Sequence, residues 1–504
     1  PCAVAYAGAE SVDGVIRTLD LVENGASNYE IVVGRNASAA ESAAASQLRT
    51  ALGTLTGVSF TINTDSRYKE DAYQIVVGNT QFAESEEALS NLKKNQSCVK
   101  VVGNKIIINS YTYSMLQEAI REWESMLKEY VVQEEDGTKS LVASTKEEVR
   151  MTDESILLDI PEFKGGTYDS VYESGNNNMQ LVYNEVDVSR IDAYLASLAE
   201  AGFEVKEDNT IGKNRFVTCL GEAGLVHLSY FSYNGSLSIT TDTLAETTYK
   251  EAEPEYEKVT DTTLAVMSLD YSHRSETDGN GESYVITLED GRYIIIDGGY
   301  MQDAEGLYQF LVDNNKRSDG KVVIAAWFLS HSHGDHYGCF GQFTSAYSSE
   351  VTLEYLVAAP GISAMYSNGY DDYLEVNLAR IAEETYQCQL IRPHTGQTLT
   401  FCNTQFQILY TLEDYALRYG YGTITSENNA ALVFKMTANG QSVLFTNDAE
   451  KAVSQLLCDT YGEELKSDIF QMNHHGVGGC IKRLCEYVDP KYSLWSTITY
   501  YTMQ

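Results

Sequence analysis

Basic residues are scarce in this sequence. Its 504 residues include 35 Lys and Arg against 72 Asp and Glu, and its formal net charge is −37. An acidic surface repels phosphate backbones and anionic lipid, because binding either one normally relies on Lys and Arg replacing counterions. The composition therefore disfavours nucleic acid as a partner and leaves small-molecule, glycan and cell-wall substrates open.

Metal-binding cysteine pairs and long apolar runs are also missing. The nine cysteines include no Cys-x-x-Cys spacing and are odd in number, which argues against a zinc ribbon and against a disulfide framework. We expect most of them to be buried apolar residues. No run of about eighteen apolar residues occurs, so no transmembrane segment is predicted.

The compartment is predicted from composition. The few Lys and Arg, the 36 Tyr and the loops rich in Gly, Ser, Asn and Thr resemble secreted or surface proteins of bacteria. The start at Pro1 lacks the basic region of a signal peptide, and a signal removed before Pro1 would leave such a chain. We expect an extracellular or cell-surface location.

The length predicts about three domains. In residues 1–140, two Ile-Val-Val-Gly strands at 29–36 and 73–80 echo each other and predict neighbouring parallel strands. Ser38 and Glu41 form a capping box that opens a helix, and Gly103-Asn104 turns a hairpin. This α/β pattern resembles the non-catalytic N-terminal domain of several glycoside hydrolases.

A small α+β domain is expected over residues 141–250. Strands are predicted at 179–184, 215–220, 225–230 and 236–240, with a helix at 187–201. His227 lies in one of these strands and is interpreted as a packed residue rather than a ligand. The acidic stretch 251–257 is predicted to link this domain to a third one at 258–504.

The richest pattern is His-Ser-His-Gly-Asp-His at 331–336, which follows the apolar run 321–330. The run predicts a buried strand that ends in a loop of ligands. Imidazoles and a carboxylate form a mixed nitrogen and oxygen set that suits one or two divalent ions and leaves room for water. Only eight His occur in the chain, so this clustering predicts a metal site.

Four ordered motifs resemble the metallo-β-lactamase fold. They are the hairpin at 283–299 that ends in Asp-Gly-Gly, the His-x-His-x-Asp-His stretch, the paired strands that end at Asp448, and the closing Asn-His-His-Gly at 473–476. The resemblance implies a C-terminal αββα sandwich and a multidomain α/β protein. It also implies a metallohydrolase with two divalent ions, most simply zinc.

Ligand roles follow from the resemblance. It implies that His331 and His333 hold the first ion, that Asp335 and His336 hold the second, and that Asp448 bridges them. His474 and His475 compete for the last position, with one binding metal and the other facing substrate. The usual Gly before the bridging Asp is Asn447 here, and Asn tolerates the same left-handed backbone.

Further residues are assigned around this set. His394 is the one His between the main motif and Asp448 and remains a possible third ligand of the first ion. Asp297 matches a carboxylate that supports the ligand loop. His273 and Arg274 lie where the family's first loop borders the site, and Arg274 is a candidate to hold an anionic substrate group.

The predicted activity is hydrolysis of an ester or phosphodiester on a glycan or cell-wall component by a metal-bound hydroxide. Asp335 would orient the nucleophile and pass a proton to the leaving group, with His475 as a second catalytic residue. Two alternatives stay open. The closing His-His-Gly resembles competence-type nucleases, and a non-enzymatic surface protein could use the metal site for structure.

Overall fold

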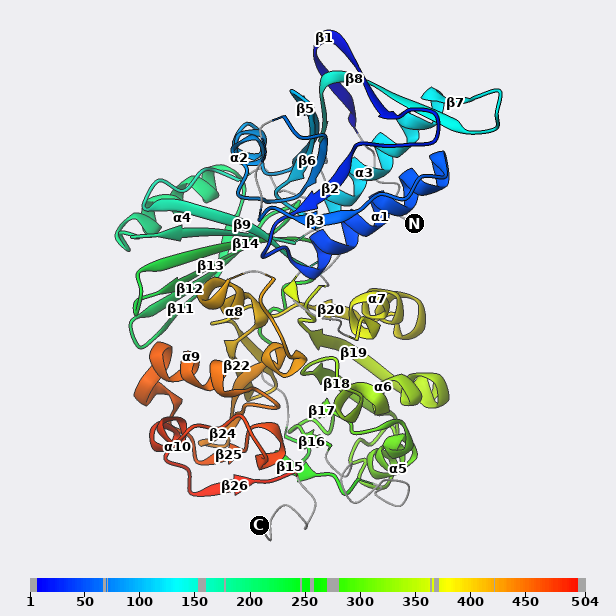
Figure 1. Cartoon of the computed structure of the whole chain (residues 1–504). Helices are drawn as coiled ribbons and strands as arrows, with labels where there is room; N and C mark the ends of the chain where they lie inside the picture. Colours follow the sequence, from blue (N-terminus) through cyan, green and yellow to red (C-terminus); the bar gives the residue numbers. More distant parts are fainter. Residues whose placement is uncertain are drawn as a thin grey trace.

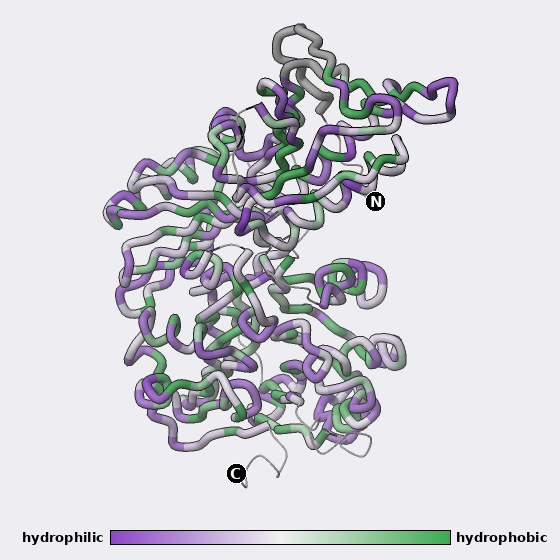
Figure 2. Tube along the Cα trace, in the orientation of Figure 1, coloured by the Kyte–Doolittle hydropathy of each residue, from purple (hydrophilic) through white to green (hydrophobic). Residues whose placement is uncertain are grey.

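The computed structural model describes residues 7–66, 69, 71–152, 160–175, 178–244, 247–253, 258–269, 281–362, 365–366, 371–420 and 422–496. These residues form four β-sheets with helices packed on them. In Figure 1 the first sheet lies at the top, the second below it, and the two C-terminal sheets at the bottom. Figure 2 shows that hydrophobic segments follow the inner strands, whereas hydrophilic ones follow many outer turns.

The first sheet has the strand order β1-β8-β5-β6-β4-β2-β3, with β7 added beside β8. Its strands are β1 (Ala7–Val22), β2 (Glu30–Val33), β3 (Ile62–Thr64), β4 (Gln74–Val77), β5 (Gln96–Val102), β6 (Lys105–Ser110), β7 (Val131–Gln133) and β8 (Lys139–Thr152). Its helices are α1 (Ala39–Thr56), α2 (Ala83–Ser90) and α3 (Tyr113–Leu127). The expected boundary after residue 140 falls inside β8, so the first sheet extends to Thr152.

Local signals in this part agree with the structure. β2 and β4 pair in parallel, and Ser38 caps α1 in a capping box with Glu41. β5 and β6 form the antiparallel hairpin expected around Gly103. These predictions are confirmed because each rests on short-range chemistry that the chain carries in one segment.

The second sheet is antiparallel, with the order β11-β12-β13-β14-β10-β9. Its elements are β9 (Thr167–Gly175), β10 (Asn178–Asn184), α4 (Arg190–Glu200), β11 (Glu204–Ile211), β12 (Asn214–Leu220), β13 (Gly224–Phe231) and β14 (Ser236–Thr243). Side chains alternate between its faces. Val217 and Cys219 join the core under the first sheet, whereas Phe216 and Phe231 join the core of the C-terminal domain.

The C-terminal domain stacks two six-stranded sheets. One contains β15 (Thr263–Val266), β16 (Ser283–Thr287), β17 (Tyr293–Asp297), β18 (Val322–Leu329), β19 (Val351–Ala358) and β20 (Gln389–Ile391). The other contains β21 (Thr398–Phe401), β22 (Thr404–Tyr410), β23 (Val433–Ala438), β24 (Gln441–Phe445), β25 (Ile469–Gln471) and β26 (Tyr492–Leu494). Ile286 and Ile294 of the first pack with Phe406 and Phe434 of the second.

Helices cover both outer faces of this pair of sheets. They are α5 (Ala304–Asp313), α6 (Gly334–Tyr347) and α7 (Tyr373–Arg380) on one side, and α8 (Leu412–Tyr419), α9 (Lys451–Tyr461) and α10 (Lys482–Val488) on the other. The result is the αββα sandwich that the sequence predicts. Among the described residues, no helix combines the length and the apolar character needed to cross a bilayer.

Candidate metal centre

The predicted ligands converge where four strands end. β18 leads into His331 and His333, and α6 follows at once with Asp335 and His336 in its first turn. β24 leads through Asn447 to Asp448, and β25 leads to the histidine pair at 474–475. Parallel neighbours such as β17 and β18 end at the same edge, so short loops bring these side chains together.

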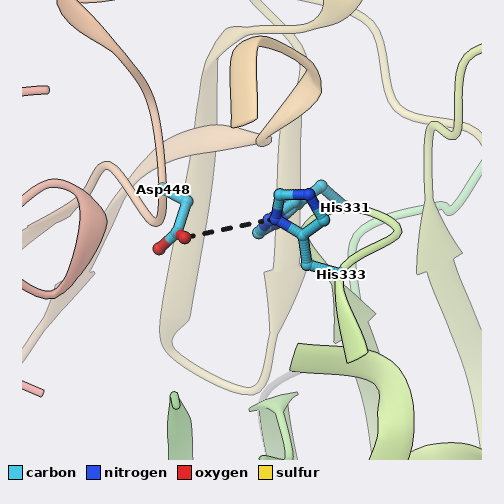
Figure 3. Close-up of side chains that lie close together, drawn as sticks. All are labelled: His331, His333 and Asp448. Atoms are coloured by element: carbon cyan, nitrogen blue, oxygen red, sulfur yellow. Dashed lines mark hydrogen bonds and ion pairs between the residues drawn. The ribbon is translucent and has the colours of Figure 1, made fainter. Parts of the chain in front are cut away.

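One group contains His331, His333 and Asp448, whose potential ligand atoms all lie within 4.8 Å of one another. Nε2 of His331 lies 3.1 Å from Nδ1 of His333 and 3.9 Å from Oδ2 of Asp448. Figure 3 shows these three side chains facing one another. Two imidazoles and a carboxylate at this spacing can hold a divalent cation.

A second group contains Asp335, His336 and His475, again within 4.8 Å. Oδ2 of Asp335 lies 3.1 Å from Nε2 of His475. Asp448 reaches this group as well, with Oδ1 at 3.3 Å from Nε2 of His336 and Oδ2 at 3.4 Å from Nε2 of His475. Asp448 thus lies between the two groups, where a bridging carboxylate would have to be.

Buried polar atoms without hydrogen-bond partners indicate whether the ligand groups could hold cations. Nε2 of His336, Nε2 of His475 and Oδ1 of Asp448 are buried and make no well-oriented hydrogen bond to any residue that the structure describes. Unpaired buried polar atoms are costly, and native structures rarely keep them without a reason. All three atoms face the second group, so a divalent cation there would satisfy them. The first group fits a cation through the chemistry of its donors, two imidazoles and a carboxylate.

The electrostatics of the cluster agree. Burial lowers the pKa of His336, but surrounding carboxylates, with Asp448 and Asp335 the strongest, raise it well above its usual value. Burial likewise opposes ionisation of Asp335, yet the charge of His336 holds the pKa of that carboxyl well below its usual range. Asp335 and Asp448 therefore remain ionised, and bound cations would balance their negative charge.

Asp297 holds the ligand loop in place. Its Oδ1 accepts the Ser330 N–H at 2.8 Å, and its Oδ2 lies 2.7 Å from Nδ1 of His336. The carboxylate thereby fixes Nδ1 of His336 as the donor and turns Nε2 toward Asp448. The indole of Trp327 donates to the Asp297 carbonyl at 2.8 Å, which fixes the supporting residue in turn.

Backbone geometry separates the two closing histidines. His474 and His475 both have left-handed backbones, with φ of 48° and 55°, so their side chains diverge. His475 is buried and belongs to the second group. The side chain of His474 is 33% exposed, and its Nε2 lies 3.8 Å from Oδ2 of Asp448, next to the first group.

His394 lies in a different environment. Its Nδ1 is 3.0 Å from Glu413, and its Nε2 contacts Asp242 of the second sheet. Its ring also stacks on His227. With both nitrogens engaged by carboxylates outside the metal groups, the structure does not bring His394 to the candidate centre. His273 and Arg274 lie outside the described residues.

Glu282 is a buried carboxylate near the ligands that the sequence did not indicate. It is fully buried, and its Oε1 accepts hydrogen bonds from Tyr284 at 3.0 Å and Ser496 at 2.8 Å. Its Oε2 lies 4.0 Å from Nδ1 of His336. Burial raises the pKa of Glu282 to about 7. Its sequence signal is weak, since it is only a carboxylate directly before a buried strand.

Comparisons with known proteins agree with this geometry. Residues 277–374 match the family described as the metallo-beta-lactamase superfamily. No curated protein matches the chain. The predicted resemblance of the first domain to a glycoside hydrolase domain stays a prediction.

Several solved structures are similar to parts of this chain. The metallo-beta-lactamase fold protein YhfI from Bacillus subtilis is 12% identical, with a TM-score of 0.29 over 46% of this chain and 88% of its own. A Cronobacter sakazakii metallo-beta-lactamase with a HARLDQ motif is 16% identical, with a TM-score of 0.25 over 42% and 85%. CmlA, a diiron beta-hydroxylase from Streptomyces venezuelae, is 11% identical, with a TM-score of 0.27 over 49% and 46%.

Proposed function

We propose that the protein is a metal-dependent hydrolase that cleaves an ester or phosphodiester on a glycan or cell-wall component. Its C-terminal domain is a metallo-β-lactamase domain, matched over residues 277–374. The observation that carries the proposal is Asp448, which lies within 4 Å of ligand atoms from both groups. We further propose that the metals are two zinc ions, because paired imidazoles and carboxylates suit zinc. The composition favours a site of action outside a bacterial cell.

The chain's own residues can then do the following. Two divalent ions, when bound, supply the positive charge that lowers the pKa of a water and stabilises negative charge on the substrate. Asp335 is ionised and 18% exposed, so its carboxylate can accept a proton from the attacking water and deliver one to the leaving oxygen. Nε2 of His475 lies 3.1 Å from Oδ2 of Asp335, in the same ligand group.

A nuclease is the second candidate, because the chain ends its site with His-His-Gly at 474–476. The net charge of −37 opposes it. Repulsion of a polyanion weakens as salt shortens the screening length from about 30 Å at 0.01 M to about 8 Å at 0.15 M. A purely structural metal site is the third candidate, but such sites are usually closed by four ligands, whereas this one is spread over two groups.

The test uses zinc-loaded full-length protein and a panel of chromogenic esters, phosphodiesters and phosphocholine conjugates, with Asp448→Ala as the matched variant. We expect hydrolysis of a small neutral or zwitterionic substrate that changes little across this salt range and disappears in the variant. Strong cleavage of DNA at low salt would replace the glycan proposal with the nuclease one. No hydrolysis of any substrate would favour the structural site.

A further inference from the structure

A cavity of about 870 Å³ lies far from the metal ligands in the sequence, between the first sheet and β9. Its walls come from the residues that follow β2, β4 and β6 and from residues 168–172 of β9. Figure 1 shows the second sheet, which contains β9, directly below the first. Ligand cavities in proteins typically measure about 300–1,000 Å³, so this one is large enough for a ligand of several rings.

The topology places this cavity at a point where ligands bind in open α/β sheets. From β2 the chain passes through α1 to β3 on one side, whereas β4 lies on the other side of β2. α1 packs with α3, whereas α2 packs on the opposite face of the sheet. The strand order therefore reverses between β2 and β4, and crevices at such reversals face the carboxyl ends of the strands.

The repeated Ile-Val-Val-Gly segments build the floor of the cavity. A Cβ on Gly34 would lie 2.4 Å from the Asn79 carbonyl oxygen, and one on Gly78 would lie 2.6 Å from Oε1 of Glu41. That same Oε1 accepts the Asn79 N–H at 2.9 Å. Glycine at both strand ends thus lets the two loops pack against each other, and the loops are held by hydrogen bonds before any ligand arrives.

Aromatic rings supply one kind of surface in the cavity. Tyr111 and Tyr113 follow β6, and Tyr168 and Tyr172 come from β9. All four are at least partly exposed, with Tyr168 at 39%. The Lys94 ammonium lies over one face of the Tyr168 ring, 4.1 Å from its centroid, so a ligand would stack on the opposite face. A tyrosine ring offers an apolar face that can cover the C–H groups of a sugar ring, and its hydroxyl can donate or accept a hydrogen bond at the rim.

The cavity also has a polar surface of side-chain amides and hydroxyls. These come from Asn36, Asn79, Thr80, Gln81 and Ser170. Arg35 is the basic residue of the lining, and it is paired with an acidic one, because its Nε lies 3.6 Å from Oδ1 of Asp65. The other charged lining residues are acidic: Glu41, Glu86 and Asp169. Such a lining repels anions and favours a neutral ligand with many hydroxyl groups.

We propose that this cavity binds a neutral oligosaccharide. Tyrosine faces would stack on the sugar rings, and the neighbouring amides and hydroxyls would pair with the sugar hydroxyls. Binding does not depend on the proposed hydrolase activity. If both hold, the cavity retains a glycan on the same chain as the metal centre and raises the local concentration of its scissile groups.

The experiment is calorimetric titration of the full-length protein with four probes: cellotetraose, chitotetraose, mannotetraose and isomaltotetraose. We expect at least one to bind, and the double substitution Tyr168→Ala with Tyr172→Ala to weaken it by about tenfold or more. Tyr168→Phe keeps the ring and should retain most of the affinity. Tyr130→Ala removes a tyrosine of the same 39% exposure outside the lining and should change nothing.

Three results would overturn the proposal: no binding of any probe at millimolar concentration, equal binding by the double variant, or tight binding of inorganic phosphate in the same cavity. Thermal unfolding of each variant shows whether a loss reflects misfolding, and Tyr168→Phe gives a folded comparison. Asp448→Ala should bind the sugar normally. Sugar binding without hydrolysis would therefore refute the proposed function alone, and hydrolysis without sugar binding would refute the cavity alone.

Discussion

The imidazole of His394 stacks on that of His227, with ring centroids 4.9 Å apart and planes inclined by only 15°. His227 belongs to β13 of the second sheet and His394 to the loop between β20 and β21, and the rings meet where the second sheet contacts the C-terminal domain. Nε2 of His227 lies 2.9 Å from the Thr395 carbonyl oxygen, and both nitrogens of His394 contact carboxylates. His394, a possible metal ligand by sequence, instead makes contacts between the second sheet and the C-terminal domain.

This contact predicts a pH-dependent stability. Burial lowers the pKa of His394, but Glu413 and Asp242 raise it, from 6.5 to about 10. His394 therefore binds its proton more tightly in the folded protein. The resulting stabilisation is complete below pH 6.5 and is lost as the pH rises through about 10.

We expect the unfolding temperature of the protein to fall between neutral pH and about pH 10, and the His394→Gln variant to lack that part of the decline. The variant should also be less stable at neutral pH by about 3–5 kcal/mol, because it leaves buried carboxylates unpaired. Burial raises the pKa of Asp414 and lowers that of His227, and the charge of His394 lowers both, so the variant changes the titration of these two groups as well. Parallel unfolding curves of the two proteins across this range would contradict the prediction.

Asp448 should control both ions. Replacement of Asp448 by alanine removes a carboxylate that reaches both ligand groups, so we expect bound metal to fall from about two ions per chain to less than one. Mass spectrometry of purified protein, loaded with zinc and freed of excess, gives the number. His394→Gln is the control and should retain both ions. A variant at position 448 that keeps two ions would show that this residue does not bridge them.

His475 and His474 should differ in effect. His475→Ala should abolish binding of the second ion, because His475 lies in the group with Asp335 and His336. His474→Ala should weaken only the first ion, since its Nε2 lies 3.8 Å from Oδ2 of Asp448 on that side. Titration with Co²⁺, followed by its visible absorption, separates the two sites. Equal losses in both variants would argue against this assignment.

Asp297→Asn should lower metal affinity by about 10–100-fold, as removal of a ligand's hydrogen-bond partner usually does. The amide replaces one of the two oxygens that receive Ser330 and His336. Asp303→Asn is a matched control, because Asp303 is also buried but contacts the Tyr300 N–H instead. The affinity is measured by competition with a zinc chelator. An unchanged zinc affinity in Asp297→Asn would show that Asp297 is not needed to orient the ligand His336.

A further prediction concerns two thiols in the segment that follows His475. Sγ of Cys480 lies 3.2 Å from Sγ of Cys485 at the start of α10. A disulfide bond of about 2.05 Å needs only a small approach. Oxidised glutathione should therefore link them, with two thiols oxidised and one glutathione disulfide reduced to two glutathione molecules. Burial raises the pKa of the Cys480 thiol, so the reaction should be faster at alkaline pH.

Counting free thiols before and after treatment measures the reaction. Two thiols per chain should disappear, and Cys485→Ser should prevent the intramolecular bond. Cys339→Ser provides the control, since Cys339 is fully buried elsewhere in the domain. Loss of thiols at the same rate in Cys485→Ser would mean that other cysteines react.

Much of the C-terminal domain was predictable because its signals are local. Asp290-Gly291 and Asn439-Gly440, both typical turn sequences, turn the hairpins β16–β17 and β23–β24. Asn447 adopts the left-handed backbone, with φ of 46°, that its position before Asp448 requires. Turn chemistry and an apolar strand before a ligand loop each act within one segment, so a single sequence carries them.

Other features depend on contacts between distant segments. The sequence places His394 between two motifs but cannot show that Asp242, 152 residues earlier, lies against its ring. Glu282 is similar, because only folding brings Gln471 and Ser496 to it. The pairing of β1 with β8 at one edge of the first sheet also went unpredicted, since long-range pairing leaves little trace in either strand alone.

The second sheet has consequences for how such a protein could have been assembled. One of its faces contributes Val217 and Cys219 to a core that contains Ile191 and Leu198 of its own helix α4, and the other contributes Phe216 and Phe231 to the core of the C-terminal domain. A module that can move between genes must be able to expose its surface to water when alone. The face that meets the C-terminal domain is apolar and would be exposed if the second sheet were alone. Gene fusion or domain shuffling would therefore have to carry the second sheet together with the C-terminal domain, and the two sequences should diverge in step.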